Sequence, residues 1–230
     1  VRMALCHAIS RDLLVQFLGK DVAKPEVSPL PEGYLGHTKD LAMYPYDVEK
    51  AKQLLAEAGF KDGFKLTMNI SNSNIYLPPM QIIQEMWKKV GVELELKVVD
   101  HPTYHKLIRQ DVNPVVIYGA YRYPLTGTRY FTQFYHSDSI VGKETAVINF
   151  SHYGEALPGV DQYIDGARFE LDQAKQVAMW EAAQKQIKSD CVSMPLFTRK
   201  YAMAKSKIFD QGFEQKSYSF YQVTEKSMIR

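Results

Sequence analysis

The chain has 230 residues, of which 46% are hydrophobic, so it can bury a full core as one large domain or two small ones. Its formal net charge of +2 is too small to indicate nucleic acid or an acidic membrane surface as a partner. No apolar run approaches the roughly 20 residues that a membrane-spanning helix needs.

The first segments are a helical region and a loop. Apolar residues recur at helical spacing in residues 1–18, and Ser10 is a residue type that caps the start of a helix. Residues 22–44 are rich in proline and glycine and show no period. We therefore expect them to form an ordered loop over the surface.

The clearest pattern follows, in the order helix, strand, helix, strand. Asp47 can cap the first helix, and Gly59 can supply the left-handed residue that ends it. Apolar and polar residues alternate in residues 64–70 and again in 92–98, which predicts two strands with one buried face each. Pro78 can start the helix between them. Because such units usually pair in parallel, the sequence predicts an α/β fold, a sheet with helices packed on it.

Two histidines lie at the short helix predicted over residues 102–109, one directly before it and one within it. His101 and His105 lie four residues apart, so they can share a helix face, and this spacing can bind a metal. No acidic or third ligand accompanies them in the sequence. We therefore expect surface histidines and no metal site.

Residues 113–121 form a short apolar run, which predicts a buried strand. Ligands of open α/β sheets bind outside the carboxyl ends of strands, so the turn that follows is the expected ligand site. Alternatively, some of its side chains simply pack under the loop. The candidate ligand-binding residues are Tyr118, Tyr121, Arg122, Tyr123, Arg129 and Tyr130.

Further elements complete the chain. A strand and a turn are predicted over residues 147–153, and a helix over 160–168. Asp172 can then cap a long helix, and residues 194–204 are predicted to form a strand. The last residues show no clear period.

The two cysteines, Cys6 and Cys191, lie far apart in sequence. They are either two buried thiols or one long-range disulfide. Free thiols are the favoured interpretation, because buried cysteine commonly packs as a small hydrophobic residue.

No catalytic signature is present in the sequence. A G-x-S-x-G elbow, a P-loop, an H-E-x-x-H motif and a dinucleotide fingerprint are all missing. The sequence also shows no arrangement of a nucleophile with a base. We therefore expect a protein that is not an enzyme and needs no cofactor.

Several segments resemble one family in the right order along nearly the whole chain. They read VRMALCHAISRDLL, YPYDVEKAKQLLAEAGFKDGFKLTM, QIIQEMWKKVGVELELKVVDHPTYHKLI, VINFSHYGEALPGVDQYIDGA and MWEAAQKQIKSDCVSMPLF. Together they are similar to the C-terminal lobe of family 5 extracellular solute-binding proteins, which are the dipeptide- and oligopeptide-binding subunits of ABC importers and their relatives. Ser10 stands where the family usually has Asp, and both residues cap helices.

This resemblance implies a periplasmic binding protein-like II fold with two lobes, in which the C-terminal lobe has a mixed sheet flanked by helices. Residues 1–212 would form the C-terminal ligand-binding lobe, and residues 213–230 a tail that returns to the N-terminal lobe. The chain would then be roughly the second half of an exported, periplasmic or extracytoplasmic protein. Its partners would be a small-molecule ligand, an inner-membrane ABC permease and its own N-terminal lobe, with no nucleic acid.

The chain departs from the peptide-binding members at the ligand turn. There the family has a Trp and then, three residues on, an Asp that pairs with the peptide's α-amino group, because a buried ammonium must be neutralised. Ala120 and Tyr123 occupy these positions here, and no acidic residue occurs between Asp111 and Asp138.

A second departure concerns the peptide carboxylate. Some dipeptide binders hold it with an Arg near the start of the second crossover helix, where this chain has Leu77 and Pro78. Arg122, Arg129 and the tyrosines therefore favour an anionic, aromatic or sugar-like solute over a free dipeptide. Alternatively, both arginines point to solvent or hold the loop. Two other functions stay open, a solute-sensing domain that feeds a signalling partner and an unrecognised enzyme.

Overall fold

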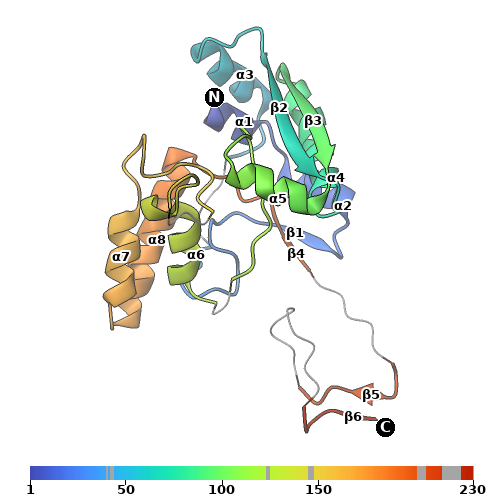
Figure 1. The fold of residues 1–230 in the computed structure, drawn as a ribbon, viewed down its shortest axis with the longest axis vertical. Helices are drawn as coiled ribbons and strands as arrows, with labels where there is room; N and C mark the ends of the chain where they lie inside the picture. The colour runs from blue at the N-terminus through green and yellow to red at the C-terminus, as the bar shows by residue number, and fades with distance from the viewer. Residues whose placement is uncertain are drawn as a thin grey trace.

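The computed structural model describes residues 1–39, 41, 44–122, 125–144, 148–200, 206–213 and 224–229. Figure 1 shows an α/β unit at the top, a group of three helices at the lower left and a short hairpin apart from both. The elements in order are α1 (Arg2–His7), α2 (Arg11–Leu18), β1 (Ala23–Pro25), α3 (Val48–Glu57), β2 (Phe64–Ser71), α4 (Leu77–Lys88), β3 (Val92–Val99), α5 (His101–Arg109), α6 (Gly127–Tyr135), the 3-10 helix Ser137–Ser139, α7 (Asp161–Phe169), α8 (Gln173–Asp190), β4 (Phe197–Arg199), β5 (Phe209–Asp210) and β6 (Met228–Ile229).

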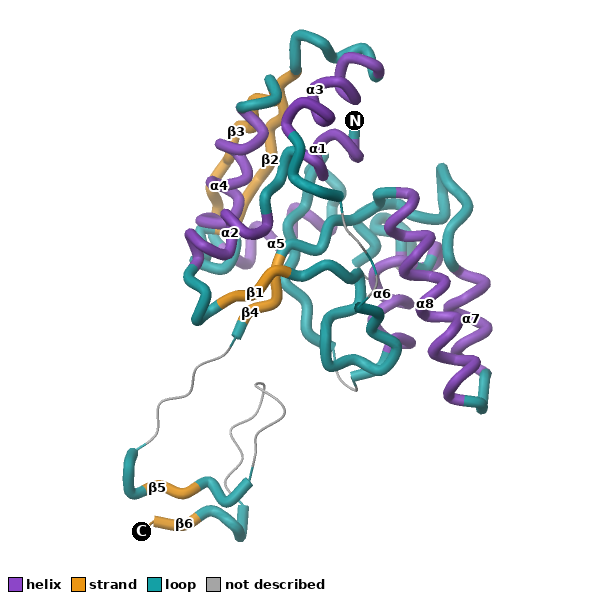
Figure 2. Tube along the Cα trace, turned by 180° about the vertical axis from the view of Figure 1, so that it is seen from behind, coloured by secondary structure: helices purple, strands orange, loops and turns teal. Residues whose placement is uncertain are grey.

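The α/β unit is built on β2 and β3, which pair in parallel from Phe64 opposite Val92 to Ser71 opposite Val99. The helix between them, α4, covers one face of the pair (Figure 2). This confirms the predicted strand, crossover helix and strand. The core of the unit includes the buried side chains Met68, Ile70, Met80, Ile83, Met86, Trp87, Val92 and Leu94.

The helix boundaries of the sequence analysis are confirmed by their caps. The carboxylate of Asp47 accepts a hydrogen bond from the Lys50 amide at 2.8 Å, and the Ser10 hydroxyl accepts one from the Leu13 amide at 3.3 Å. Asp172 accepts from two amides in the first turn of α8. Such bonds satisfy donors that the helix itself cannot pair.

The helical unit is formed by α6, α7 and α8 around the buried ring of Trp180. Gly36 and Gly127 lie against this ring so closely that a Cβ atom added to either would come within 2.6 Å of it. The glycines therefore allow the loop of residues 22–44 and the start of α6 to close over the tryptophan.

Two predicted strands need correction. Residues 113–121 form no strand. Hydrogen bonds between side chains and the main chain are formed here in place of the main-chain bonds of a paired strand. The Asn113 side chain accepts from the Asn69 amide at 3.0 Å and donates to the Asn69 carbonyl at 2.8 Å. The Tyr104 hydroxyl donates to the Ile117 carbonyl at 2.6 Å. In the segment 194–204 only β4 is a strand among the described residues, and residues 201–204 lie outside them.

The prediction that residues 22–44 form a loop is also wrong for one short segment. It contains β1, which pairs antiparallel with β4 from Ala23 opposite Arg199 to Pro25 opposite Phe197. The strand is only three residues long, and it is paired by a segment near the other end of the chain, so local sequence carries little signal for it.

The remaining pairings are short. Of the strand predicted over residues 147–153, Val147 lies outside the described residues and Asn149 forms an isolated bridge with Ile140. Near the C-terminus, β5 and β6 pair antiparallel, and they lie apart from the α/β and helical units in Figure 1. In the part of the chain that the structure describes, no helix has the length and apolar character to cross a membrane.

Candidate functional site

The structure places the candidate residues around one loop and one helix. Tyr118, Tyr121 and Arg122 lie in the loop between α5 and α6, and Arg129 and Tyr130 lie in α6. The predicted residue Tyr123 lies outside the described residues. The ligand was expected at the carboxyl end of a strand over residues 113–121, and that strand is not formed. The loop instead begins beside β2, where the Asn113 side chain accepts from the Asn69 amide.

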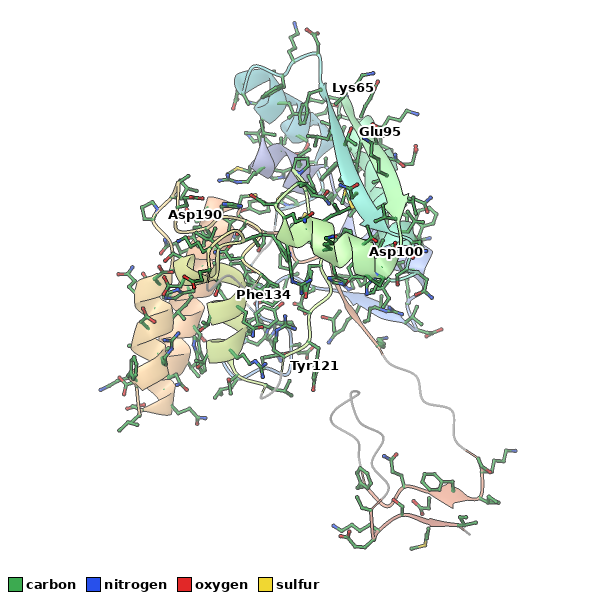
Figure 3. The ribbon with its side chains drawn as sticks, in the orientation of Figure 1. Lys65, Glu95, Asp100, Tyr121, Phe134 and Asp190 are labelled. Atoms are coloured by element: carbon green, nitrogen blue, oxygen red, sulfur yellow. The ribbon has the colours of Figure 1, made fainter. Side chains whose placement is uncertain are left out.

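Three of the candidates meet at one ring, that of Phe134. Figure 3 labels this residue in α6. The guanidinium carbon of Arg122 lies 5.2 Å from the centre of this ring. The ring centre of Tyr130 lies 4.8 Å from it, and that of Tyr118 lies 5.9 Å from it. We refer to Tyr118, Arg122, Tyr130 and Phe134 as the Phe134 cluster. An aromatic face that carries a stacked cation attracts both rings and negative charge.

Arg122 is held in place by its neighbours. The Tyr34 hydroxyl donates to the Arg122 carbonyl and accepts from the Arg122 amide, both at 2.8 Å. On the side chain, Nε donates to Gln133 Oε1 and Nη1 donates to the Tyr121 carbonyl. Part of the guanidinium therefore holds the loop in place, which is one of the two alternative roles considered for the arginines in the sequence analysis. These bonds also fix its position before any ligand arrives.

The charge of Arg122 is not paired with a carboxylate in the part of the chain that the structure describes. There, no Asp or Glu forms an ion pair with this guanidinium. The nearest acidic residues in sequence are Asp111, at the start of the loop between α5 and α6, and Asp138, which follows α6. A cation that is fixed on an aromatic ring and not neutralised by the protein favours an anion.

Tyr34 and Tyr130 are neutral at ordinary pH. Burial raises the pKa of Tyr34 and raises that of Tyr130 well above the usual value near 10. Tyr130 also packs edge-on against Tyr34, with ring centres 5.6 Å apart. Uncharged phenols beside a cation can hydrogen-bond or stack on a ligand without repelling a negative charge.

Tyr118 joins the Phe134 cluster to a second group of rings. Its ring centre lies 5.3 Å from Phe150 and 5.7 Å from His105. His105 Nε2 lies 3.2 Å from His101 Nε2, so the two histidines do share a helix face. No group of three or more metal-binding side chains is found among the described residues.

The other two described candidates are not part of the cluster. Arg129 is exposed, whereas Tyr121 is half-buried and lies apart from Phe134 in Figure 3. Sequence reasoning missed Tyr34, Gln133 and Phe134. Phe134 follows Tyr130 by four residues, which places both on one helix face and is a signal that could have found it. Nothing local to Tyr34 indicates its contact with Arg122, 88 residues away.

Two hollows in the surface lie elsewhere. One of about 370 Å³ is lined by parts of α2 and β1 together with Lys20 and Lys200, and one of about 260 Å³ lies beside Arg11 and Tyr44. Neither is lined by a residue of the Phe134 cluster. The Phe134 cluster is therefore a candidate site because of the contacts between its own side chains, and neither hollow supports it.

Comparison with known proteins places the chain in a family. The family model described as "Bacterial extracellular solute-binding proteins, family 5 Middle" matches residues 1–141. Among curated proteins, the chain is 30% identical over 125 residues to heme-binding protein A of Haemophilus influenzae, covering 52% of this chain and 23% of that protein. It is 34% identical over 101 residues to the glutathione-binding protein GsiB of Pectobacterium atrosepticum, covering 44% of this chain and 20% of that protein.

Solved structures agree on the fold. The binding protein MoaA from A. tumefaciens R10, in complex with mannopinic acid, matches with a TM-score of 0.82 and 36% identity over 100% of this chain and 46% of that one. The periplasmic protein DppA from Helicobacter pylori, in complex with the peptide STSA, matches with a TM-score of 0.77 and 24% identity over 85% of this chain and 37% of that one. The latter match shows the fold alone.

The chain covers only part of the length of each of these relatives. The chain matches less than a quarter of the length of these two curated relatives and less than half of either solved structure. The relatives are binding proteins of ABC transporters and not enzymes, and their fold is the periplasmic binding protein type II fold that the resemblance implied. The chain belongs to the family 5 bacterial extracellular solute-binding proteins.

Proposed function

We propose that this chain forms the C-terminal lobe of the substrate-binding protein of an ABC importer and that it binds a small organic acid at the Phe134 cluster. The observation that carries the proposal is the guanidinium of Arg122, stacked on Phe134 without a carboxylate partner among the described residues. A carboxylate of the ligand would supply that partner, with charge-assisted hydrogen bonds to the guanidinium.

The proposed binding mechanism requires both lobes, because this lobe supplies only one side of the site. The Phe134 cluster supplies one wall, and the N-terminal lobe would supply the other when the two lobes close around the ligand by a hinge. Closure would remove water from the Arg122 charge, which strengthens its interaction with an anion. The closed protein would then deliver the solute to an inner-membrane permease from the extracytoplasmic side.

One relative supports the class of ligand. MoaA binds mannopinic acid, and its 36% identity extends over all of this chain. The dipeptide-binding relative matches at 29% identity over 52% of the chain. The missing acid in the ligand turn also weakens the case for a free peptide, because the peptide's ammonium would have no partner there. An acid related to mannopinic acid is therefore the first ligand to test.

The test is isothermal titration of the full-length protein, both lobes included, with mannopinic acid. We expect binding by the wild type and a loss of roughly 10- to 100-fold in affinity for Arg122→Ala, because a hydrogen-bonded charge pair contributes about 1.5–3 kcal/mol. Arg122→Lys should not restore it, since lysine has no planar fork and stacks poorly.

Arg199→Ala is the matched control, because Arg199 is exposed on β4 and its removal takes away the same charge. It should leave the affinity unchanged. Agropinic acid, glutathione and the dipeptide Met-Leu complete the set of ligands. Binding of Met-Leu with no binding of either acid, or an unchanged affinity in Arg122→Ala, would refute the proposal.

A further inference from the structure

The two cysteines of the chain, 185 residues apart in sequence, meet in space. Cys6 lies in α1 and Cys191 directly follows α8, and their sulfur atoms are 3.0 Å apart. Both are buried, with 7% and 4% of their surface exposed. Since the bonded sulfurs of a disulfide are about 2.05 Å apart, a small shift of the two side chains is enough to join them.

The sulfur pair lies where the two units of the lobe meet. Cys6, Tyr44 and Cys191 form a small buried cluster of their own, between the core of the α/β unit and that of the helical unit. Two further contacts hold the same helix ends together. Arg2 Nη2 donates to the Asp190 carbonyl at 3.4 Å, and the Tyr44 hydroxyl donates to the Lys188 carbonyl. The thiols are therefore kept close by contacts that do not depend on a bond between them.

The backbone of Cys191 marks the end of α8. It has φ 50° and ψ 46°, which is the left-handed conformation that ends a helix. Asp111 and His152 also have a positive φ, so this conformation does not itself indicate a bond. The case for a bond rests on the distance between the two sulfurs and on their burial.

We propose that Cys6 and Cys191 form a disulfide that joins α1 to α8 and so ties the α/β unit to the helical unit. The oxidant is a small disulfide such as oxidised glutathione. One of the two cysteines, as its thiolate, attacks one sulfur of it and releases one glutathione thiol, which leaves a mixed disulfide on that cysteine. The thiol of the other cysteine then loses its proton and attacks the protein sulfur of the mixed disulfide, which releases the second glutathione thiol. Two protein thiols are oxidised and one glutathione disulfide is reduced to two thiols.

The surroundings of the two sulfurs indicate when the exchange takes place. Both side chains are buried in the folded chain, so a disulfide as large as oxidised glutathione reaches them while the chain folds. In the completed fold, the hydrogen bond between the two sulfurs lowers the pKa of Cys191 and raises that of Cys6. That difference belongs to the folded chain, so it assigns no order to the two attacks.

The experiment is refolding with a chemical readout, and it requires no ligand. The reduced, unfolded chain is refolded in a mixture of oxidised and reduced glutathione, its free thiols are blocked with N-ethylmaleimide, and the product is digested with trypsin for mass spectrometry. Cleavage isolates Cys6 in residues 3–11 and Cys191 in residues 189–199. We expect these two peptides joined and lighter than their sum by two hydrogens. Both cysteines blocked by maleimide, or each bound to glutathione, would overturn the proposal.

Thermal unfolding tests the role of the bond. Wild type with the cross-link should melt about 5–10 °C above Cys6→Ser/Cys191→Ser, because the bond restricts the unfolded chain. A reducing agent should remove that difference and leave the double variant unchanged. A wild-type melting temperature that does not respond to the reducing agent, in protein shown to be cross-linked, would mean that the bond does not tie the units. Failure of ligand binding would not affect either result.

Discussion

The guanidinium of Arg122 and the ring of Phe134 lie 5.2 Å apart, on a loop and a helix that the sequence does not connect by any motif. Arg122 is fixed by hydrogen bonds to three neighbours, and Phe134 also carries two tyrosine rings. The pair is thus built as a rigid surface with one positive charge. Replacing either residue has a separable effect, because one supplies the charge and the other supplies the surface.

Phe134→Ala should weaken both stability and binding. The change removes a half-buried ring that contacts Tyr118, Arg122 and Tyr130, so we expect a loss of about 2 kcal/mol in the free energy of unfolding. Affinity for mannopinic acid should fall by roughly tenfold, because the loss of a stacking surface costs about 1 kcal/mol. Urea denaturation and isothermal titration of the full-length protein measure the two effects. Phe169→Ala is the control, because Phe169 is 78% exposed, and equal effects in both variants would contradict the prediction.

Gly127→Ala should destabilise the chain through a clash with Trp180. A Cβ at this position would lie 2.6 Å from the Trp180 ring, whereas the backbone of Gly127 is not in the left-handed region. Overpacking of this kind costs about 1–3 kcal/mol, which exceeds the gain of about 1 kcal/mol that alanine brings to a helix. Gly119→Ala should have little effect, since its nearest neighbour would be 3.6 Å away. Denaturation midpoints compare the two, and a midpoint for Gly127→Ala at or above the wild-type value would rule out the clash.

Asn113→Ala should cost about 2–3 kcal/mol of stability. It removes a buried amide that bonds to both the amide and the carbonyl of Asn69, and these main-chain groups of β2 would then be left unpaired. Asn74 is exposed, so Asn74→Ala is the matched control. Hydrogen exchange of the Asn69 amide should also become faster in Asn113→Ala only. An unchanged exchange rate at Asn69 would show that another group replaces the Asn113 side chain.

His152 should make stability depend on pH. It lies 2.9 Å from both Glu155 and Asp111, and the hydrogen bonds to these carboxylates, that of Glu155 first, raise the pKa of His152. A raised pKa in the folded chain means that the protonated form stabilises it. This contribution is complete below the unfolded pKa of about 6.5 and disappears as the pH rises through the folded value.

The test compares wild type with His152→Asn, which tolerates the positive φ of 52° at this position. The wild type should be more stable than the variant at pH 6, and the difference should shrink at pH 9. Because 33% of the His152 side chain is exposed, solvent screening keeps the effect below about 1 kcal/mol. A difference that is equal at both pH values would mean that the pairing contributes no charge-dependent stability.

Local patterns in the sequence were enough to predict the helices and strands of the α/β unit. The caps at Asp47 and Ser10 and the alternation in β2 and β3 are properties of neighbouring residues, and the structure confirms them. The segment 113–121 was predicted wrongly because its apolar run has the composition of a strand. Instead, its Ile117 carbonyl accepts from the Tyr104 hydroxyl and its Gly119 amide donates to the Tyr76 hydroxyl, and no pattern within the segment shows these contacts.

The candidate site was predictable in part for the same reason. The crowding of tyrosine and arginine pointed to the loop, and Tyr118, Arg122 and Tyr130 do meet at one ring. Which of the candidates meet depends on how α6 is turned against the loop, and that is set by contacts with Tyr34 and Trp180 from far along the chain. That these residues bind a ligand stays a prediction, as does the division at residue 212.

The close fit of Trp180 between Gly36 and Gly127 gives the chain a built-in optical probe. Of its two tryptophans, Trp87 lies in the α/β unit, where its indole nitrogen donates to the Leu5 carbonyl at 3.2 Å, whereas Trp180 touches the first residue of α6. The Trp180 indole nitrogen is buried and has no hydrogen-bond partner among the described residues. Its emission should therefore respond to a rotation of α6 against the ring, and Trp87→Phe leaves Trp180 as the one tryptophan of these 230 residues to report motion at the ligand loop.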